Sequence, residues 1–452
     1  MSKYLHIGID DTDSPRKGCT TYVAALLVES LSALNVDFID FPSLIRLNPN
    51  VPWKTRGNGS LCLRIRYDSD IFNEIQDIAL QLITQESDIS YDGTDPAVVF
   101  FHGISIPKEL TLFSKEVIQK IVKLDKAIQL IQKYRMEAVG FKEGRGIIGA
   151  LAAIGEILLG DHTYELITYR QAENIGRLRK INNDSVFKMD SIMKDLTFNN
   201  IDYDKRRVLI APRGLDPVLF GVRGETPEAV TKAASLVEIG ERIDRWVIFR
   251  TNQGTDAHFF RRQKISDVRP NHPVIIKGYV NRSPFTIKGR HVIFSIKDES
   301  GEIDCAAYEP TGNFRNIVRK LMQGDAVEVY GSVRPTDTDH PMTINLEKIK
   351  VIHLVPFVKM YNPVCPQCNK RMKSMGSDAG FRCERCGFRD RDAKKQVVIN
   401  ERGINIQLYI PPARANRHLT KPLERYEREK SLKNLYKPTN FWGLSFSDLR
   451  SD

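Results

Sequence analysis

Hydrophobic and polar residues alternate along the first 270 residues in a way that predicts interspersed strands and helices. Short apolar or alternating runs predict strands at 4–9, 61–67, 98–101, 163–169, 208–210 and 246–250. Apolar residues at helical spacing predict helices at 23–34, 71–86, 115–133 and 147–158. Thr20 or Thr21 is the expected N-cap of the first helix, and Pro227 is expected in the first turn of a later one. The alternation indicates a mixed α/β or α+β fold, and 61–101 is compatible with half of a ferredoxin-like unit.

Beyond residue 273 the pattern changes to closely spaced strands. Five are expected, at 274–280, 291–298, 302–308, 326–333 and 344–351. One helix, at 314–322, falls between the third and the fourth. Five strands with a helix in this position follow the order of an OB-fold, and a generic small barrel is the alternative.

The composition is that of a globular protein with several domains. A chain of 452 residues corresponds to three or four domains, and 41% hydrophobic with 27% charged residues excludes a disordered chain, a collagen-like fibre and a coiled-coil rod. There is no run of about 18 apolar residues, and acidic residues come too early at the N-terminus for a signal peptide. These observations predict a cytoplasmic protein without a membrane partner.

The net charge of +11 is concentrated near the C-terminus. Residues 359–440 hold 19 Lys and Arg against 8 Asp and Glu, whereas residues 1–358 hold 47 against 46. A cluster of positive charge favours electrostatic binding to the phosphates of a nucleic acid. A solvated, solubilising tail is the alternative interpretation.

Four of the seven cysteines lie within this basic region and predict a zinc site. Cys365 and Cys368 form one CxxC pair, and Cys383 and Cys386 form the second after fourteen residues. Two such pairs can supply a closed tetrahedral shell of thiolates, which indicates a structural rather than a catalytic zinc ion. Basic residues suited to nucleic acid flank the pairs, namely Lys370, Arg371, Lys373, Arg382, Arg385 and Arg389.

An acidic turn follows the first predicted strand. Asp10, Asp11 and Asp13 lie within four residues, and in an extended chain Asp11 and Asp13 would face the same way. Three close carboxylates repel one another unless a cation lies among them, and oxygen ligands favour Mg²⁺, often with nucleotide phosphates in its shell. A solvated turn with Asp in capping positions is the alternative.

A glycine-rich segment opens the predicted helix at 147. Gly144, Gly146 and Gly149 would let backbone N–H groups approach a phosphate, with Lys142 and Arg145 adding positive charge. The segment matches neither the P-loop pattern nor the dinucleotide fingerprint. Close packing of the helix is the alternative.

Two polar loops are further candidates for a binding site. Asp216, Arg223 and Glu225 lie in a Gly/Pro-rich segment, and Asp256 and His258 lie in a second loop. Turn formation and surface ion pairs would explain each of them equally well.

The motifs together resemble one family. Gly8-Ile9-Asp10-Asp11-Thr12-Asp13-Ser14 with Gly18-Cys19-Thr20-Thr21, then Lys142 to Ala150, and Arg213 to Glu225, are similar to the archaeal tRNA 2-agmatinylcytidine synthetases. The resemblance extends over residues 4–415. Lys17-Gly18 stands before Cys19 where two small residues would be expected, a departure that leaves the flexibility at Gly18.

The resemblance implies an ATP-dependent ligase. Members of the family join agmatine to C2 of the wobble cytidine in the CAU anticodon of a minor isoleucine tRNA, and ATP is converted to AMP and phosphate. The agmatidine formed pairs with A instead of G. By motif position, Asp10 and Asp11, with Asp13 less firmly, would bind the metal, and Thr20 would become phosphorylated. ATP would contact Lys142, Gly144, Arg145, Gly146 and Gly149.

The resemblance also implies a domain order and leaves the agmatine pocket open. Kinase-like segments are expected at 1–60 and 132–196, ferredoxin-like segments at 61–131 and 197–270, an OB-fold at 271–356, a zinc ribbon at 357–418 and a basic tail at 419–452. A guanidinium needs a carboxylate, for which Asp216, Glu225 and Asp256 are candidates beside Arg223. The alternatives are a non-enzymatic single-strand binder and a kinase-like enzyme acting on another RNA.

Overall fold

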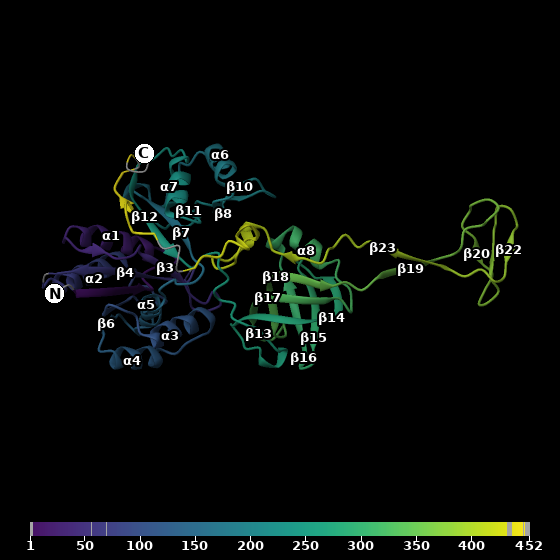
Figure 1. Cartoon of the computed structure of the whole chain (residues 1–452), viewed down its shortest axis with the longest axis horizontal. Coiled ribbons are helices and arrows are strands. Elements are labelled where there is room, and N and C mark those ends of the chain that lie inside the picture. Colours follow the sequence, from purple (N-terminus) through teal and green to yellow (C-terminus); the bar gives the residue numbers. More distant parts are fainter. Residues whose placement is uncertain (1–2, 56, 69, 432–435, 446, 448–452) are drawn as a thin grey trace.

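The computed structural model describes residues 3–55, 57–68, 70–431, 436–445 and 447. Three parts follow one another in Figure 1: a large α/β part, a small barrel, and a ribbon at the end of a two-stranded stalk. In the described part of the chain, no helix combines the length and the apolar character needed to cross a membrane.

A sheet of eleven strands, counted over the described residues, forms the α/β part. Its main order is β6-β5-β1-β4-β3-β12-β7-β11-β8, with β2 on β4 and β25 on β12. The strands are β1 (Lys3–Asp10), β2 (Asp37–Phe38), β3 (Ser43–Arg46), β4 (Gly59–Tyr67), β5 (Ala97–His102), β6 (Glu137–Gly140), β7 (Thr163–Arg170), β8 (Thr197–Phe198), β11 (Val218–Gly224), β12 (Ile243–Thr251) and β25 (Trp442–Gly443). A separate hairpin joins β9 (Ile201–Asp202) to β10 (Arg207–Val208).

Helices cover both faces of this sheet. They are α1 (Thr20–Ser32), α2 (Phe72–Glu86), α3 (Lys108–Gln119), α4 (Leu124–Lys133), α5 (Gly146–Gly155), α6 (Asn183–Met193) and α7 (Pro227–Ser235). Successive side chains of a strand point to opposite faces, so Val98 of β5 packs with α1 and α2 while Val99 packs with α3 and α5. The two apolar cores that result confirm the predicted mixed fold.

Two details of the predicted helices are wrong. The helix expected at 115–133 is two helices, α3 and α4, because the chain becomes extended at Lys120 and buries Val122 before the second helix begins. The N-cap of α1 is Cys19, not Thr20 or Thr21. The Thr20 hydroxyl instead accepts a hydrogen bond from Thr12 Oγ1 at 3.0 Å. Thr226 does cap α7 through Ala229 N, as the Pro227 signal indicated.

The barrel has the predicted OB-fold order. It consists of β14 (Pro273–Thr286), β15 (Val292–Asp298), β16 (Gly301–Ala307), β17 (Ala326–Arg334) and β18 (Thr343–His353). Pairing of β14 with β17 closes it, and α8 (Asn313–Val318) lies between β16 and β17. Short strands β13 (Arg262–Gln263) and β24 (Leu408–Tyr409) pair with β14 and β18.

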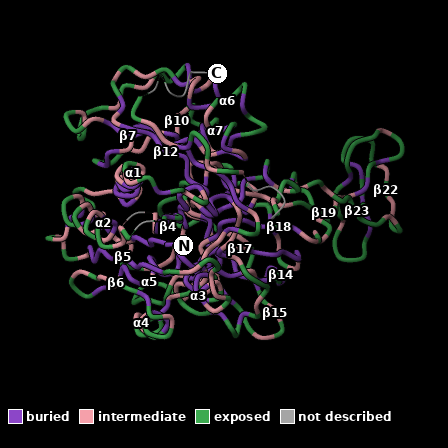
Figure 2. Tube along the Cα trace, turned by 60° about the vertical axis from the view of Figure 1, so that its left-hand side comes forward, coloured by how far each residue is buried: buried purple, intermediate pink, exposed green. Residues whose placement is uncertain are grey.

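A two-stranded stalk carries the ribbon away from the barrel (Figure 1). β19 (Phe357–Tyr361) pairs with β23 (Gln396–Asn400), and the tip holds β20 (Lys373–Ser374), β21 (Phe381–Arg382) and β22 (Arg389–Asp390). Figure 2 shows the tip mostly exposed and the strands of the large sheet buried.

The described chain after the ribbon, here called the return segment (residues 401–431 and 436–445), runs back along the barrel to the large sheet (Figure 1). Leu419 is buried in one apolar core and Phe441 in the other, where it packs against Phe38 and Phe41. The sequence predicted a basic tail from residue 419. The described part of that tail is packed chain instead, because apolar and charged side chains both find partners in the α/β part.

Candidate functional site: a cavity between an acidic turn and a cationic wall

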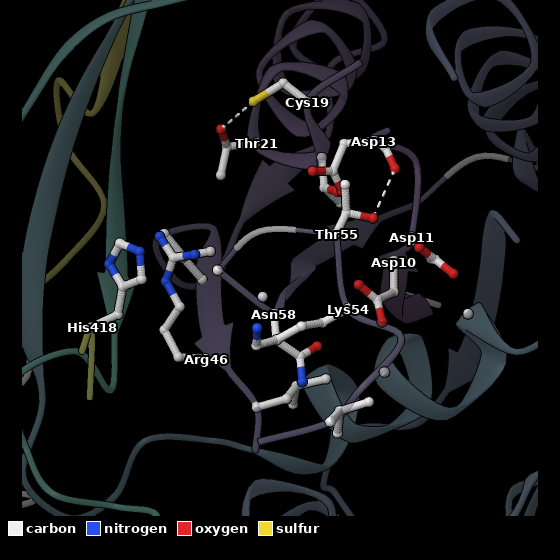
Figure 3. A pocket seen from close by; sticks show the side chains of 18 of the residues that line it. Asp10, Asp11, Asp13, Cys19, Thr21, Arg46, Lys54, Thr55, Asn58 and His418 are labelled. Carbon is white, nitrogen blue, oxygen red and sulfur yellow. Dashed lines mark hydrogen bonds between the residues drawn. The ribbon is translucent and has the colours of Figure 1, made fainter. Parts of the chain in front are cut away.

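A cavity of about 390 Å³ lies in the α/β part. Its lining comes from the end of β1, the start of α1, the β3–β4 connection, the α3–α4 link, the start of α5, the strands β7 and β11, and His418 of the return segment. Figure 3 shows the three aspartates on one side of it, with Arg46 and His418 across from them.

The acidic turn forms one wall of the cavity. Asp10 ends β1, and Asp11 has a φ of 58°, the left-handed region, so the chain turns sharply there. The hydroxyls of Thr55 and Thr94 donate to the carbonyl oxygen of Asp13 at 3.3 and 3.0 Å and hold the turn in place. Asp10, Asp11 and Asp13 all line the cavity, as the metal-site prediction requires.

The aspartates do not form a closed metal shell by themselves. Among the described residues, the carboxylate oxygens of Asp10, Asp11 and Asp13 do not all lie within 4.8 Å of one another. The expected convergence of Asp11 and Asp13 assumed an extended chain, which the left-handed Asp11 interrupts. Burial and the neighbouring carboxylates raise the pKa of Asp10 well above its usual value, and burial raises that of Asp11 to about 6. Such a wall favours a bound cation.

The glycines at the start of α5 make room for this turn. A Cβ atom on Gly149 would lie 1.8 Å from Asp10 Oδ2, and one on Gly146 would lie 2.5 Å from the Asp95 carbonyl oxygen. Both residues also line the cavity. The close-packing alternative is therefore confirmed, and a contact with phosphate stays a prediction.

The two predicted cations beside the glycines differ in position. Arg145 lines the cavity and lies 2.8 Å from Asp95 and 3.4 Å from Asp11. Lys142 donates to the carbonyl oxygens of Tyr91 and Thr94 at 2.6 and 3.1 Å. Lys142 and Gly144 do not line the cavity. Lys142 stabilises the loop through its hydrogen bonds, and Gly144, with a φ of 70°, allows the loop to turn.

The opposite wall is a hydrogen-bonded cluster of charges. Arg223 Nε lies 2.9 Å from the Glu165 carboxylate, and Arg46 lies 3.8 Å from it. Gln253 is fully buried; its amide donates to Glu165 and its Oε1 lies 3.1 Å from Arg223 Nε and 3.0 Å from His418 Nδ1. The guanidinium of Arg46 and burial lower the pKa of His418 well below 6.5, so the imidazole is neutral at pH 7. Two guanidiniums against one carboxylate leave this wall cationic.

Of the predicted substrate-binding residues, Asp216 and Arg223 line the cavity, whereas Glu225 and Asp256 do not. Glu225 is paired with Arg425 and Lys430, and Lys348 lies 2.5 Å from Asp256. Both carboxylates are thus bound by or beside the return segment, and the structure does not bring them to the cavity.

Sequence reasoning missed several residues that line the cavity. They are Arg46, Lys54, Thr55, Asn58, Glu165 and His418. A signal existed for some of them, because Lys54-Thr55 and Gly57-Asn58-Gly59 form a polar, glycine-rich stretch between two strands. Nothing local marks Glu165 within its strand or His418 near the C-terminus.

The four cysteines meet at the tip of the ribbon. Cys365 Sγ lies 3.5 Å from Cys386 Sγ, Cys368 Sγ lies 3.3 Å from Cys383 Sγ, and all four sulfurs lie within 4.8 Å of one another. A zinc ion about 2.3 Å from each thiolate requires Sγ separations of about 3.8 Å. The arrangement therefore fits the predicted structural zinc site.

Replacing one ligand of this site, as in Cys365→Ser, is expected to release the zinc ion and unfold the tip, because few other buried contacts hold it. Metal analysis of the purified protein should show about one zinc ion per chain for the native protein and a large loss for the variant. Cys305→Ser is the matched control, since Cys305 is buried in the barrel away from the ribbon. An unchanged zinc content in Cys365→Ser would contradict the site.

The structure corrects the interpretation of the basic C-terminal region. Ion pairs within the α/β part and the barrel occupy Arg402, Arg414, Arg417, Lys421, Arg425 and Lys430. The basic side chains that flank the cysteines are exposed by contrast. Among the described residues of 359–440, much of the exposed positive charge therefore lies on the ribbon, where a phosphate-binding surface stays a prediction.

Comparison with known proteins covers almost the whole chain. Family models match at 6–143 (TiaS TCKD domain), 144–258 (TiaS FLD domain), 274–352 (OB-fold nucleic acid binding domain) and 362–404 (TiaS C-terminal zinc ribbon domain). These models divide the α/β part at residue 143, whereas the sequence prediction interleaves two domains there; the interleaved boundaries stay a prediction.

Curated relatives and solved structures agree with the models. The isoleucine-tRNA 2-agmatinylcytidine synthetase TiaS of Methanocaldococcus jannaschii is 43% identical, over 93% of this chain and 98% of that protein. That of Pyrococcus horikoshii is 42% identical, over 93% and 96%. The crystal structure of TiaS in complex with an isoleucine tRNA, AMPCPP and agmatine matches with a TM-score of 0.81 at 36% identity, covering 97% of this chain and 100% of that one. A complex of TiaS with the tRNA and ATP matches with a TM-score of 0.83 at 38% identity, over 94% and 97%.

Proposed function

The chain belongs to the isoleucine-tRNA 2-agmatinylcytidine synthetase (TiaS) family, and we propose that it joins agmatine to C2 of the wobble cytidine in the CAU anticodon of a minor isoleucine tRNA. ATP is consumed to AMP and phosphate, and the product agmatidine lets the tRNA read AUA. The observation that carries the proposal is the cavity itself, which sets an anionic wall opposite a cationic wall. Since its substrate is tRNA, we place the enzyme in the cytoplasm.

The chemistry explains why such a cavity is needed. The C2–O group of cytosine resembles an amide carbonyl and does not react with amines. The conversion of ATP to AMP gives up two phosphoryl groups. One is transferred to this oxygen and creates a leaving group, and the other passes to water and is released as a second phosphate. The agmatine amine then forms a bond to C2, the C2–O bond breaks, phosphate leaves with the former base oxygen, and the amine nitrogen loses a proton. Holding the three reactants in one cavity is the main contribution of the protein.

The acidic turn is the proposed site for the metal and ATP. Mg²⁺, when bound, neutralises the charge of the transferred phosphoryl group. Asp10, Asp11 and Asp13 would hold it together with phosphate oxygens, which suits carboxylates that do not complete a shell alone. Arg145 and the N-terminus of α5 face the same space and favour the triphosphate.

Thr20 is the proposed site of phosphorylation. It is the first residue of α1, lines the cavity, and its hydroxyl is already held by Thr12. Agmatine is proposed to bind in the same cavity, with the carboxylate of Asp216 as the partner of its guanidinium and Arg223 nearby.

The barrel and the ribbon are proposed to hold the tRNA. The wobble base has to leave the anticodon stack to reach the cavity, so the rest of the tRNA needs separate contacts. Exposed Lys and Arg side chains around the four cysteines provide phosphate contacts at the end of the stalk.

A non-enzymatic single-strand binder is not favoured, because it would leave the cavity and its acidic turn without a role. The discriminating experiment is ATP hydrolysis with Mg²⁺, agmatine and the tRNA. We expect AMP and phosphate to form over many turnovers only when both agmatine and the tRNA are present. If no ATP is hydrolysed with all components present, the ligase proposal is wrong.

A further inference from the structure

Three exposed apolar side chains lie beside the cavity. Leu178 and Ile175 belong to the loop 171–182 before α6, and Leu215 to the loop 211–217 before β11 (both elements are labelled in Figure 1). Leu178 is 92% exposed, Leu215 55% and Ile175 40%. We call these three side chains the apolar ridge. It adjoins the cavity, because Asp216, the neighbour of Leu215, is one of the lining residues.

Two arginines hold the loops of the ridge in place. Arg170, almost fully buried, donates to the carbonyl oxygens of Arg177 and Leu178 at 2.8 and 3.2 Å. Arg179 donates to the carbonyl oxygens of Val218, Gly214 and Asp216 at 2.8, 3.1 and 3.0 Å and so ties the first loop to the second. Leu178 therefore projects from a well-fixed backbone rather than from a loose tip.

The two loops meet at the ridge. A Cβ atom on Gly176, between Ile175 and Leu178, would lie 3.8 Å from Leu215 Cδ2. Large apolar side chains exposed on two adjoining loops indicate a binding site, because water contact is unfavourable for them.

The surroundings of the ridge are positively charged. Arg177, Lys180 and Arg213 are exposed, and none of them forms an ion pair with any other residue in the described ranges. A partner that combines flat apolar faces with negative charge would match this surface. Single-stranded RNA has that combination, since its bases present apolar faces and its backbone carries phosphates.

We propose that the apolar ridge receives the nucleotides that flank the target cytidine. The inference rests on the proposed function. When the cytidine leaves the stack and enters the cavity, the faces of its neighbours lose their stacking partner. Leu178 and Leu215 cover these faces, as apolar side chains do at unstacked base steps, while the three exposed cations bind the adjoining phosphates.

The test uses the tRNA with 2-aminopurine in place of the adenosine that follows the cytidine in the CAU anticodon. Its fluorescence reports loss of stacking. Binding to the native enzyme is expected to raise the fluorescence, and the double variant Leu178→Ala/Leu215→Ala is expected to lose most of that rise. The same variant is expected to show a KM for tRNA raised about tenfold, with the KM for agmatine and for ATP unchanged.

Leu112→Ala is the matched control, because Leu112 lies on the outer side of α3 with the same 55% exposure as Leu215. It should leave both the fluorescence rise and the KM for tRNA as in the native enzyme. A double variant with native fluorescence and native KM for tRNA would overturn the proposal, and so would a raised KM for agmatine alone. If the native enzyme binds the probe tRNA through the ridge but transfers no agmatine, the proposed function is wrong, whereas the ridge is still supported as an RNA-binding surface.

Discussion

The substitution Gly149→Ala is expected to remove most of the activity while leaving the fold intact. Alanine stabilises a helix more than glycine does, by up to about 1 kcal/mol, so the change should not weaken α5 itself. Its Cβ atom, however, would lie 1.8 Å from Asp10 Oδ2 and 3.1 Å from Leu47 Cδ1. The carboxylate can rotate away, and the proposed metal and ATP site then loses its geometry.

A displacement of this size at a reacting centre costs about 10²-fold in rate, and we expect kcat to fall by about that factor. Gly160→Ala is the control, because a Cβ atom there meets nothing within 4 Å. Steady-state agmatine transfer and thermal unfolding should be measured on both variants. Native kcat in Gly149→Ala would show that the position of Asp10 does not matter for the reaction.

The second large effect is expected from Arg425→Met in the return segment. Arg425 is 1% exposed; its Nε donates to Glu225 at 2.6 Å and its Nη2 to Asp161 at 2.8 Å. Methionine fills much of the same space but leaves two carboxylates without this partner in a poorly solvated site. Removing one member of a buried ion pair costs about 3–5 kcal/mol, and we expect the lower end because Lys421 and Lys430 remain nearby.

Two measurements test this variant. The first is the free energy of unfolding from urea denaturation, and the second is limited proteolysis of the return segment. Arg428→Met, three residues away and exposed, should change stability by less than about 0.5 kcal/mol. If both variants are equally stable, the return segment is not anchored by Arg425. Because His418 lies on the same segment, loss of the anchor should also raise the KM for agmatine.

Local patterns in the sequence predicted most of the fold and half of the site. Period-two runs indicated the barrel strands, and the paired CxxC motifs indicated the zinc ribbon. The acidic turn was recognisable because Asp10, Asp11 and Asp13 are neighbours along the chain, so their proximity needed no knowledge of the sheet.

The cationic wall could not be predicted in the same way. Arg46, Glu165 and Gln253 come from separate segments, and they meet because β3, β12 and β7 are adjacent in the sheet. That order depends on long-range pairing.

The burial of individual charges could not be predicted either. A charge count treats every Lys and Arg as equal, and it does not reveal that Arg425 is buried against Asp161 while Arg385 is exposed. The break between α3 and α4 was missed because the apolar spacing continues across it.

The most direct test of the central claim is mass spectrometry of the nucleosides from the CAU-anticodon tRNA after incubation with the enzyme, ATP, Mg²⁺ and agmatine. The cavity is expected to convert the wobble cytidine into a nucleoside heavier by agmatine minus water, with no such product from Asp10→Asn. An unchanged cytidine with the native enzyme, or the same product in full yield from Asp10→Asn, would contradict the account.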